Sequence, residues 1–414
     1  MSDPARPILY PLTTAQRDIW IGQILDPASD FLTACCVEFF GAIDTVLLEQ
    51  ALRQSVRETD GQHLNFVSTE DGPRQYFRLI ADFDIPVLDF TGKQDPRCAA
   101  MAWMRNDRSK AFDIANGPLF RYAIIETARD RFFLYGAIHH LIIDWFGASL
   151  LLRRIGEVYG ALIKREDAPA PGRASLLELL EEEAAYHRSG RHARDQNYWS
   201  DQLARRPDAV TLSGQTPHWP GAMLRSEAVI PGHVVERLER LGASQGASLP
   251  AVIMAAAAIY QGRVTGASDL ILGMPVSGRT TPKMRRVVGL AANTVPLRLA
   301  LDPGGSVDAL LQQVGRRVRD ALRHQRYQAS KLRQHLGLTP DQPALYGTLV
   351  NFRPLDEDVD FAGVAIRKHD LTMGRIEDFM IAVQAGGPAA DLRLDFGANE
   401  HHYDETALEV HRRH

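Results

Sequence analysis

The sequence predicts an α/β protein built from two lobes. At 414 residues, and with a loose prior of about 150 residues per domain, the chain is long enough for two or three lobes. Patterns typical of strands and of helices alternate irregularly in both halves, which fits α/β lobes better than a barrel. A Pro- and Gly-containing segment at residues 168–172 is the clearest linker. We therefore place an N-terminal lobe at residues 1–172 and a C-terminal lobe at residues 173–414.

The first half contains patterns for three helices and two strands. Thr13 is followed three residues later by Gln16, which is the spacing of a capping box and predicts that a helix begins there. The other elements follow from apolar residues spaced i, i+4 in helices and from apolar runs in strands. They are a helix at 45–57, strands at 119–126 and 131–138, and a helix that begins at Gly147.

The second half is read in the same way. The predicted helices cover 178–203, 234–241, 250–264 and 306–323, and the predicted strands cover 271–276 and 294–301. Gly242, Ser244 and Gly246 match the G-x-S-x-G pattern of a hydrolase nucleophile. A charged helix precedes them where a nucleophile elbow needs an apolar strand, so we interpret them as the end of a helix.

Composition excludes several classes of protein. Hydrophobic residues make up 45% of the chain and charged residues 24%, which argues against disorder. The net charge of −4 gives no basic field for nucleic acid. The longest clean apolar run, Leu249 to Tyr260, is too short to span a bilayer, and the N-terminus has no apolar signal region. With three cysteines, of which Cys35 and Cys36 are adjacent, we expect core thiols and a cytoplasmic protein.

Two adjacent histidines, His139 and His140, stand at the exit of the apolar strand, and Asp144 follows four residues later. Neighbouring residues on a strand point to opposite faces, so one ring can face inward while the other faces a cleft. Imidazole suits proton transfer near neutral pH. The alternative is a pair of structural histidines at a strand end. We predict no metal site, because the spacing is not that of a zinc helix and no cysteine ligands are near.

The segment HHLIID resembles the HHxxxDG motif of condensation domains of nonribosomal peptide synthetases, in the chloramphenicol acetyltransferase-like superfamily. Further matches occur in the same order along the chain. They are Pro11–Trp20, Asp195 with Tyr198 and Trp199, Val288–Pro296, Arg323–Tyr327 and Val350–Phe352. These matches cover nearly the whole chain, so the resemblance implies two acetyltransferase-like lobes arranged in a V, with the histidine motif at their junction.

The resemblance also implies an activity. An amine, carried as an aminoacyl group on the phosphopantetheine arm of a peptidyl carrier protein, would attack an acyl thioester and form an amide. His140 would act as base or orient the amine, His139 would be structural, and Asp144 would bind an arginine, for which Arg279 is the candidate. Asn293 would line the junction. No cofactor is bound covalently; acyl-CoA or an acyl carrier protein would be the donor, and the rest of a synthetase would act in cis.

The chain departs from the motif at Trp145, where the family has glycine. The resemblance implies two substrate tunnels that lead to the motif from opposite faces. Four interpretations of Trp145 stay open: it shapes a native acyl pocket, it was engineered, it blocks one of these tunnels, or it packs in the core. Trp145, Gly147 and Ala148 are candidate substrate-binding residues, and the small Ala148 would lengthen an acyl pocket. Leu151 and Leu152 are further candidates for its wall, but for these two we favour ordinary packing of the helix against the sheet. His63 stands where the family commonly has arginine.

We expect the starter subtype, which N-acylates the first amino acid of a lipopeptide, because Met1 lies only ten residues before the first motif. The donor would then arrive in trans. Three alternatives stay open: an ordinary peptide-bond-forming condensation domain, a non-catalytic recruiting module, and a stand-alone acyltransferase of the same fold. Comparing activity on a carrier-bound acceptor with activity on a soluble amine distinguishes a condensation domain from a stand-alone acyltransferase. Binding without turnover would indicate the recruiting module.

Overall fold

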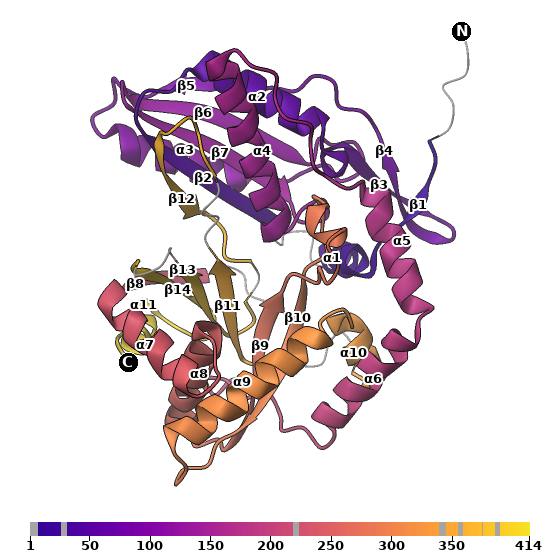
Figure 1. The fold of residues 1–414 in the computed structure, drawn as a ribbon, viewed down its shortest axis with the longest axis vertical. Coiled ribbons are helices and arrows are strands. Elements are labelled where there is room, and N and C mark those ends of the chain that lie inside the picture. Colours follow the sequence, from indigo (N-terminus) through magenta and orange to yellow (C-terminus); the bar gives the residue numbers. More distant parts are fainter. Residues whose placement is uncertain are drawn as a thin grey trace. The chain divides into compact units, whose positions relative to one another are not determined.

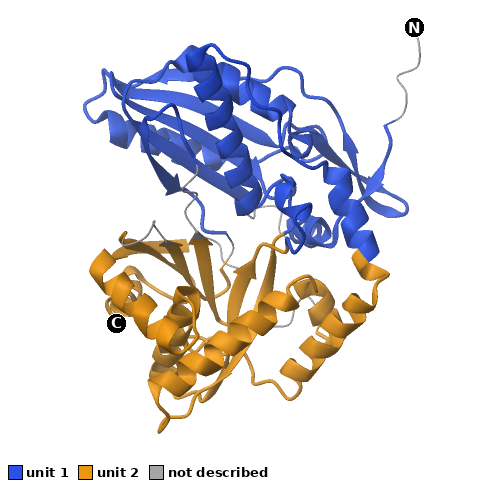
Figure 2. Ribbon diagram, in the orientation of Figure 1, with its two compact units in different colours: residues 1–185, 279–291, 358–374 blue, residues 186–278, 292–357, 375–414 orange. Residues whose placement is uncertain are grey.

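The computed structural model describes residues 7–25, 31–217, 223–338, 345–354, 359–374, 376–385 and 390–414. The chain divides into two compact units, each assembled from three stretches of sequence (Figure 2). Unit 1 contains Met1–Ala185, Arg279–Ala291 and Asp358–Gly374, and unit 2 contains Tyr186–Gly278, Ala292–Glu357 and Arg375–His414. The lobe boundary after residue 172 stays a prediction, since these units are discontinuous in sequence.

Unit 1 is built on a sheet that is antiparallel except at β5 (Figure 1). In spatial order its strands are β12 (Ala365–Asp370), β2 (Leu32–Phe40), β7 (Arg131–His139), β6 (Phe120–Ala128) and β5 (Val87–Asp89). Helices α2 (Thr45–Arg57) and α4 (Trp145–Lys164) pack in one apolar cluster with alternate residues of β2, such as Val37 and Phe39. Helix α3 (Pro96–Arg108) packs with the opposite set, such as Cys36, so helices cover both faces.

The rest of unit 1 includes a small second sheet. Its strands, in spatial order, are β1 (Tyr10–Pro11), β4 (Gly72–Phe77) and β3 (Leu64–Thr69). The 3₁₀ helix η1 (Asp60–His63) leads into β3, and α1 (Thr14–Leu25) follows β1 directly. Helix α5 (Leu176–His187) extends from the end of the linker, and the 3₁₀ helix η2 (Met284–Arg286) lies in the stretch 279–291.

Unit 2 is built on a larger mixed sheet (Figure 1). Its strands are β10 (Asn293–Ala300), β9 (Asp269–Val276), β11 (Thr348–Pro354), β13 (Phe379–Ala385), β14 (Leu392–Asn399) and β8 (Met223–Ile230). Its helices are α6 (Gly190–Leu203), α7 (Gly232–Ser244), α8 (Leu249–Thr265), α9 (Val307–Arg323), α10 (Ala329–His335) and α11 (Glu405–Arg413). Trp199, Ala258 and Val314 lie in its main core, so α6, α8 and α9 contribute to one apolar cluster.

Local signals placed most of the expected elements. The capping box is present, because the Thr13 hydroxyl accepts from the Gln16 N–H at 3.1 Å and Gln16 Oε1 accepts from the Thr13 N–H at 2.9 Å. The helix at 45–57 is confirmed with the same bounds, and the two expected strands at 119–138 are β6 and β7. Ser244 is the last residue of α7, which confirms a helix end there.

Two expectations needed correction, and one helix was missed. Helix α4 begins at Trp145 and not at Gly147, because the Asp144 carboxylate caps it two residues earlier. The single helix expected over 178–203 is wrong: α5 ends at His187, and α6 begins after Ser189. Helix α3 was not expected at all, although Asp95 followed by Pro96 at its start is a recognisable N-terminal signal.

Among the described helices, none is by itself long and apolar enough to cross a membrane; α7 and α8 pass such a test only as a pair bent by 95°.

Candidate active site

His140 lies immediately after β7 and is half-buried. Its backbone N–H donates to the Phe31 carbonyl at 2.8 Å, which fixes the main chain. Its ring Nδ1 lies 2.7 Å from the Ile143 carbonyl. A carbonyl can only accept, so Nδ1 carries the proton and Nε2 keeps its lone pair. The local turn therefore holds His140 in the tautomer that a general base requires.

His139, the last residue of β7, is buried and bound at both ring nitrogens. Its Nδ1 accepts from the Leu141 N–H at 3.2 Å, so Nε2 carries the proton and donates to Gln23 Oε1 at 3.3 Å. Burial, with a contribution from the neighbouring His140, lowers the pKa of His139 to about 3. His139 is thus neutral and held in place, which fits a structural role.

Asp144 joins two parts of unit 1 through a single buried carboxylate. Its Oδ1 accepts from the Gly147 N–H at 2.8 Å, and its Oδ2 accepts from Arg279 Nη1 at 2.6 Å and from the Ala291 N–H at 2.9 Å. Burial acts to raise the pKa of Asp144, but the Arg279 charge and these hydrogen bonds hold it below its ordinary value. The carboxylate is therefore ionised.

Arg279 is the arginine that the resemblance suggested as the partner of Asp144, and the structure contains this ion pair. The guanidinium is buried; its Nη2 donates to the carbonyls of Gly289 at 2.8 Å and Val287 at 3.3 Å. It also lies 4.8 Å from the ring centroid of Phe146. Arg279 thereby fixes the stretch 279–291 against the first turn of α4.

Gly147 lies where that stretch packs against α4. A Cβ atom there would lie 3.1 Å from the backbone N and O of Gly289 and 3.0 Å from Cγ1 of Ile143. Any larger residue would have to displace backbone. The structure thus gives Gly147 a packing function, and its role in binding substrate stays a prediction.

Trp145, at the motif's glycine position, is the first residue of α4 and is half-buried. The Lys368 ammonium lies 4.3 Å from its ring centroid. This distance is that of a cation–π contact. His63, at the other departure from the family pattern, accepts at Nδ1 from the Ile80 N–H at 3.2 Å and donates from Nε2 to the Arg57 carbonyl at 3.1 Å. Both of its nitrogens are thus used in local structure.

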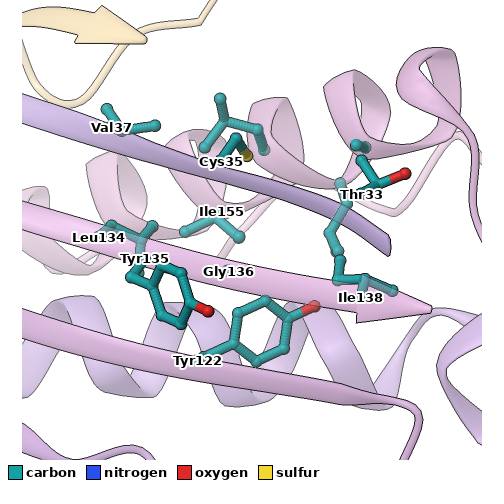
Figure 3. A pocket seen from close by; sticks show the side chains of 12 residues that line it. Thr33, Cys35, Val37, Tyr122, Leu134, Tyr135, Gly136, Ile138 and Ile155 are labelled. Atoms are coloured by element: carbon teal, nitrogen blue, oxygen red, sulfur yellow. The ribbon is translucent and has the colours of Figure 1, made fainter. Parts of the chain in front are cut away.

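An apolar pocket, partly open to solvent, lies between α4 and the sheet of unit 1 (Figure 3). The empty space in this region, open solvent included, is about 450 Å³. Its walls come from β2, β7, β6 and one face of α4. The lining residues are Thr33, Cys35, Val37, Tyr122, Leu134, Tyr135, Gly136, Ile138, Ala148, Leu151, Leu152 and Ile155. Ile138 precedes His140 by two residues, so the pocket begins beside the histidine motif.

Sequence reasoning named Ala148 and residues 151–152 of this lining but missed the strand residues. Gly136 lies opposite Cys35 on β2 and opposite Tyr122 on β6. Having no side chain, it leaves a hollow in the sheet where a Cβ would lie 3.2 Å from the Tyr122 ring. A glycine within an apolar strand was the one available signal, since such residues often mark close approach of another group.

Asn293 belongs to unit 2, and its buried amide is fully hydrogen-bonded there. Nδ2 donates to the carbonyls of Gln325 and Tyr327, each at 2.9 Å. Oδ1 accepts from the N–H groups of Thr294 at 2.9 Å and Ala329 at 3.0 Å. Asn293 thus ties the start of β10 to the loop before α10, and a role in substrate binding stays a prediction.

In the ranges that the structure describes, no group of three or more His, Cys, Asp or Glu side chains is arranged to hold a metal ion. The chemistry available at the motif is that of an imidazole whose Nδ1 is bound to a backbone carbonyl, which leaves the Nε2 lone pair to act as a base. Such a group can take a proton from a nucleophile placed next to it. The mixed α/β fold and this site fit an acyltransferase of the chloramphenicol acetyltransferase-like class, which the comparisons with known proteins establish.

The condensation domain family model matches residues 8–414. The chain therefore belongs to the condensation domain family of nonribosomal peptide synthetases, whose members are amide-bond-forming acyltransferases. It is 35% identical over 404 residues to the dimodular nonribosomal peptide synthase of Bacillus subtilis (strain 168), and 35% identical over 405 residues to the isonitrile lipopeptide synthase of Streptomyces coeruleorubidus. These matches cover 97% and 96% of this chain but only 17% and 28% of the relatives.

Solved structures show the same likeness. A mutant of the starter condensation domain of rhizomide synthetase RzmA, crystallised with C8-CoA and Leu-SNAC, has a TM-score of 0.91 and 34% identity, and the match covers 98% of this chain and 92% of that one. The first condensation domain of the CDA synthetase has a TM-score of 0.91 and 29% identity, covering 98% and 94%.

Proposed function

We propose that this chain is a starter condensation domain, which transfers a fatty acyl group from acyl-CoA to the amine of an aminoacyl group on a peptidyl carrier protein. The product is an N-acyl aminoacyl thioester, the first intermediate of a lipopeptide. The observation that carries the proposal is the apolar pocket that has Ala148 in its wall and whose lining extends to Ile138, two residues before His140. An acyl chain needs such a pocket, because it has no polar group that would stabilise it elsewhere.

The reaction follows from the state of His140. The amine attacks the thioester carbonyl, and a C–N bond forms as the carbonyl electrons move to oxygen. Nε2 of His140 accepts the amine proton, because Nδ1 already donates to the Ile143 carbonyl. When the C–S bond breaks, the sulfur leaves as the thiol of CoA with a proton returned by His140. Alignment of the two substrates supplies much of the acceleration, so no covalent enzyme intermediate is required.

The relatives support the same substrate class. The RzmA domain is named a starter condensation domain and was crystallised with C8-CoA, and one relative is named a lipopeptide synthase. Gly136 and Ala148 keep side-chain volume out of the pocket at two facing walls, which suits an alkyl chain. In a peptide-bond-forming domain the donor would present polar amide groups, for which the described lining offers little.

An intact-mass assay tests this proposal. The protein is mixed with an aminoacyl-loaded carrier protein and acyl-CoAs of two to sixteen carbons, beside His140→Ala. A gain of one acyl mass on the carrier, absent with His140→Ala, is the expected result. A gain only with an aminoacyl-loaded carrier as donor would indicate an ordinary condensation domain. Transfer only to a soluble amine would indicate a stand-alone acyltransferase, and binding without any transfer would indicate a recruiting module.

A further inference from the structure

Strand β12 borders the pocket on its β2 side, although no β12 residue belongs to the lining given above. Lys368 stands directly opposite Val37 of β2, and Asp370 stands opposite Cys35. Residues opposite each other in an antiparallel pair share a face of the sheet. Because Val37 and Cys35 line the pocket, Lys368 and Asp370 are on the pocket's face of the sheet.

The start of helix α4 lies near the same β12 side of the pocket. Trp145 precedes Ala148 by three residues, and residues with this spacing are neighbours on one face of a helix. The Lys368 ammonium lies 4.3 Å from the centroid of the Trp145 ring, so a side chain from β12 meets one from the start of α4. Both are half-buried. The two side chains thus bridge the sheet and the helix beside the pocket.

The charge of Lys368 also affects the pKa of a pocket-lining thiol. Burial raises the pKa of the Cys35 thiol to about 11, and the Lys368 ammonium opposes part of that effect. A lysine stem is apolar over its four methylenes, so it can cover apolar surface while its charge rests on an aromatic ring.

We propose that Lys368 is a specificity-determining residue: by holding Trp145 across the β12 side of the acyl pocket, it keeps wide acyl groups out and admits slim alkyl chains. This inference rests on the proposed function and adds to it a restriction on the width of the substrate. It also gives a use to tryptophan at a motif position where the family has glycine.

Two donors with eight acyl carbons test the restriction: octanoyl-CoA is slim and phenylacetyl-CoA is wide. The measured quantity is the ratio of kcat/KM for phenylacetyl-CoA to that for octanoyl-CoA, with the dissociation constants of both donors measured without acceptor. Lys368→Met keeps the length of the side chain but removes its charge. It is expected to raise the ratio about two- to fivefold, the equivalent of one cation–π contact, through KM and not kcat.

The other variants give the proposal its control. Lys368→Arg is expected to keep the wild-type ratio, because guanidinium also binds an aromatic face. Arg367→Met, which removes the neighbouring exposed cation that lies over Phe40, is the matched control and is expected to leave the ratio unchanged. Trp145→Gly is expected to raise the ratio at least as much as Lys368→Met. In that background Lys368→Met adds nothing, since the lysine acts through the indole.

The inference is overturned if Lys368→Met leaves the ratio at the wild-type value, or if it has the same effect with and without Trp145. Trp145→Leu keeps apolar bulk but removes the aromatic face, and it serves as the second variant if Trp145→Gly does not fold. If the wild-type protein transfers acyl groups but Lys368→Met does not change the ratio, this inference is wrong and the proposed function stands. A wild-type protein that neither binds nor transfers either donor defeats the proposed function as well.

Discussion

Asp144 and Arg279, separated by 135 positions in the sequence, form a buried ion pair with 2.6 Å between Oδ2 and Nη1. The same carboxylate caps α4, and the same guanidinium binds two carbonyls of the stretch 279–291. The pair therefore holds the helix that follows the histidine motif against a segment from much later in the chain. Because both charges are out of water, neither side chain is replaceable alone.

Arg279→Met is expected to lower the free energy of unfolding by about 3–5 kcal/mol, because it leaves the Asp144 carboxylate buried without its counter-charge. Chemical denaturation measures this loss. Arg285→Met, at an exposed arginine in the same stretch, is the control and is expected to change stability by about 0.5 kcal/mol or less. Adding Asp144→Asn to Arg279→Met should cost less than the sum of the single changes, and strict additivity would count against the pairing.

His140→Ala is expected to lower kcat about 10²- to 10⁴-fold, because Nε2 of this ring is the base that the geometry provides. The loss of the hydrogen bond to the Ile143 carbonyl costs only about 1 kcal/mol of stability. Steady-state acyl transfer and thermal unfolding separate the two effects. A variant that folds and retains a rate within tenfold of the wild type would show that His140 does not act as the base.

His139 makes the free energy of unfolding depend on pH. Its pKa is about 3 in the folded protein, below the ordinary value of 6.5, so between these values the unfolded chain binds a proton that the folded protein does not. Stability from this group is complete above about pH 6.5, is lost as the pH falls, and stops falling near pH 3. At pH 5 we expect the titration of His139 to lower the free energy of unfolding by about 2 kcal/mol relative to its value above pH 6.5.

His139→Asn provides the comparison, because its Oδ1 can still accept from the Leu141 N–H but does not titrate. Chemical denaturation of both proteins at pH 7.5 and pH 5 measures the difference. The variant is expected to lose about 2 kcal/mol less than the wild type on acidification. Equal losses would mean that His139 is not held neutral by burial.

Ala148→Phe is expected to reduce kcat/KM for long acyl-CoAs by at least about tenfold while acetyl-CoA is little affected, because the ring would fill the pocket. Acyl transfer over a series of chain lengths measures the change. Ile163→Phe places the same ring at an exposed position on the same helix and serves as the control. A uniform loss at every chain length would argue that Ala148 does not border the acyl group.

Cys35 reports on occupancy of the pocket. Burial raises the pKa of its thiol to about 11, and the thiolate is the reactive form, so alkylation is expected to be slow at pH 8 and faster at pH 10. In a Cys98→Ser background, which removes the exposed thiol, peptide mapping by mass spectrometry follows Cys35. A long-chain acyl-CoA is expected to slow the alkylation, and CoA alone is not. Equal protection by CoA would place the acyl group elsewhere.

Signals that act between close neighbours in sequence were sufficient for most of the long helices and for β6, β7, β9 and β10, but strands such as β8, β13 and β14 were not predicted. Thr13 and Gln16 form their capping box, and apolar spacing places α2, β6 and β7, because the forces involved span only a few residues. The histidine motif and the pairing of Asp144 with Arg279 were expected from ordered resemblances along the chain. The start of α4 was missed, since an aspartate can either cap a helix or pair with an arginine, and Asp144 does both.

By itself, then, the sequence determined the family, the histidine motif and the elements that carry it, because these depend on residue identity and short-range spacing. Only the tertiary structure decided which nitrogen of His140 bears the proton, how Gly136 and Ala148 border one pocket, and that Lys368 lies over Trp145. Each of these depends on backbone and side chains brought together by strand pairing and helix packing. β12 pairs with β2 across more than 300 residues, a separation over which no local pattern can specify a partner.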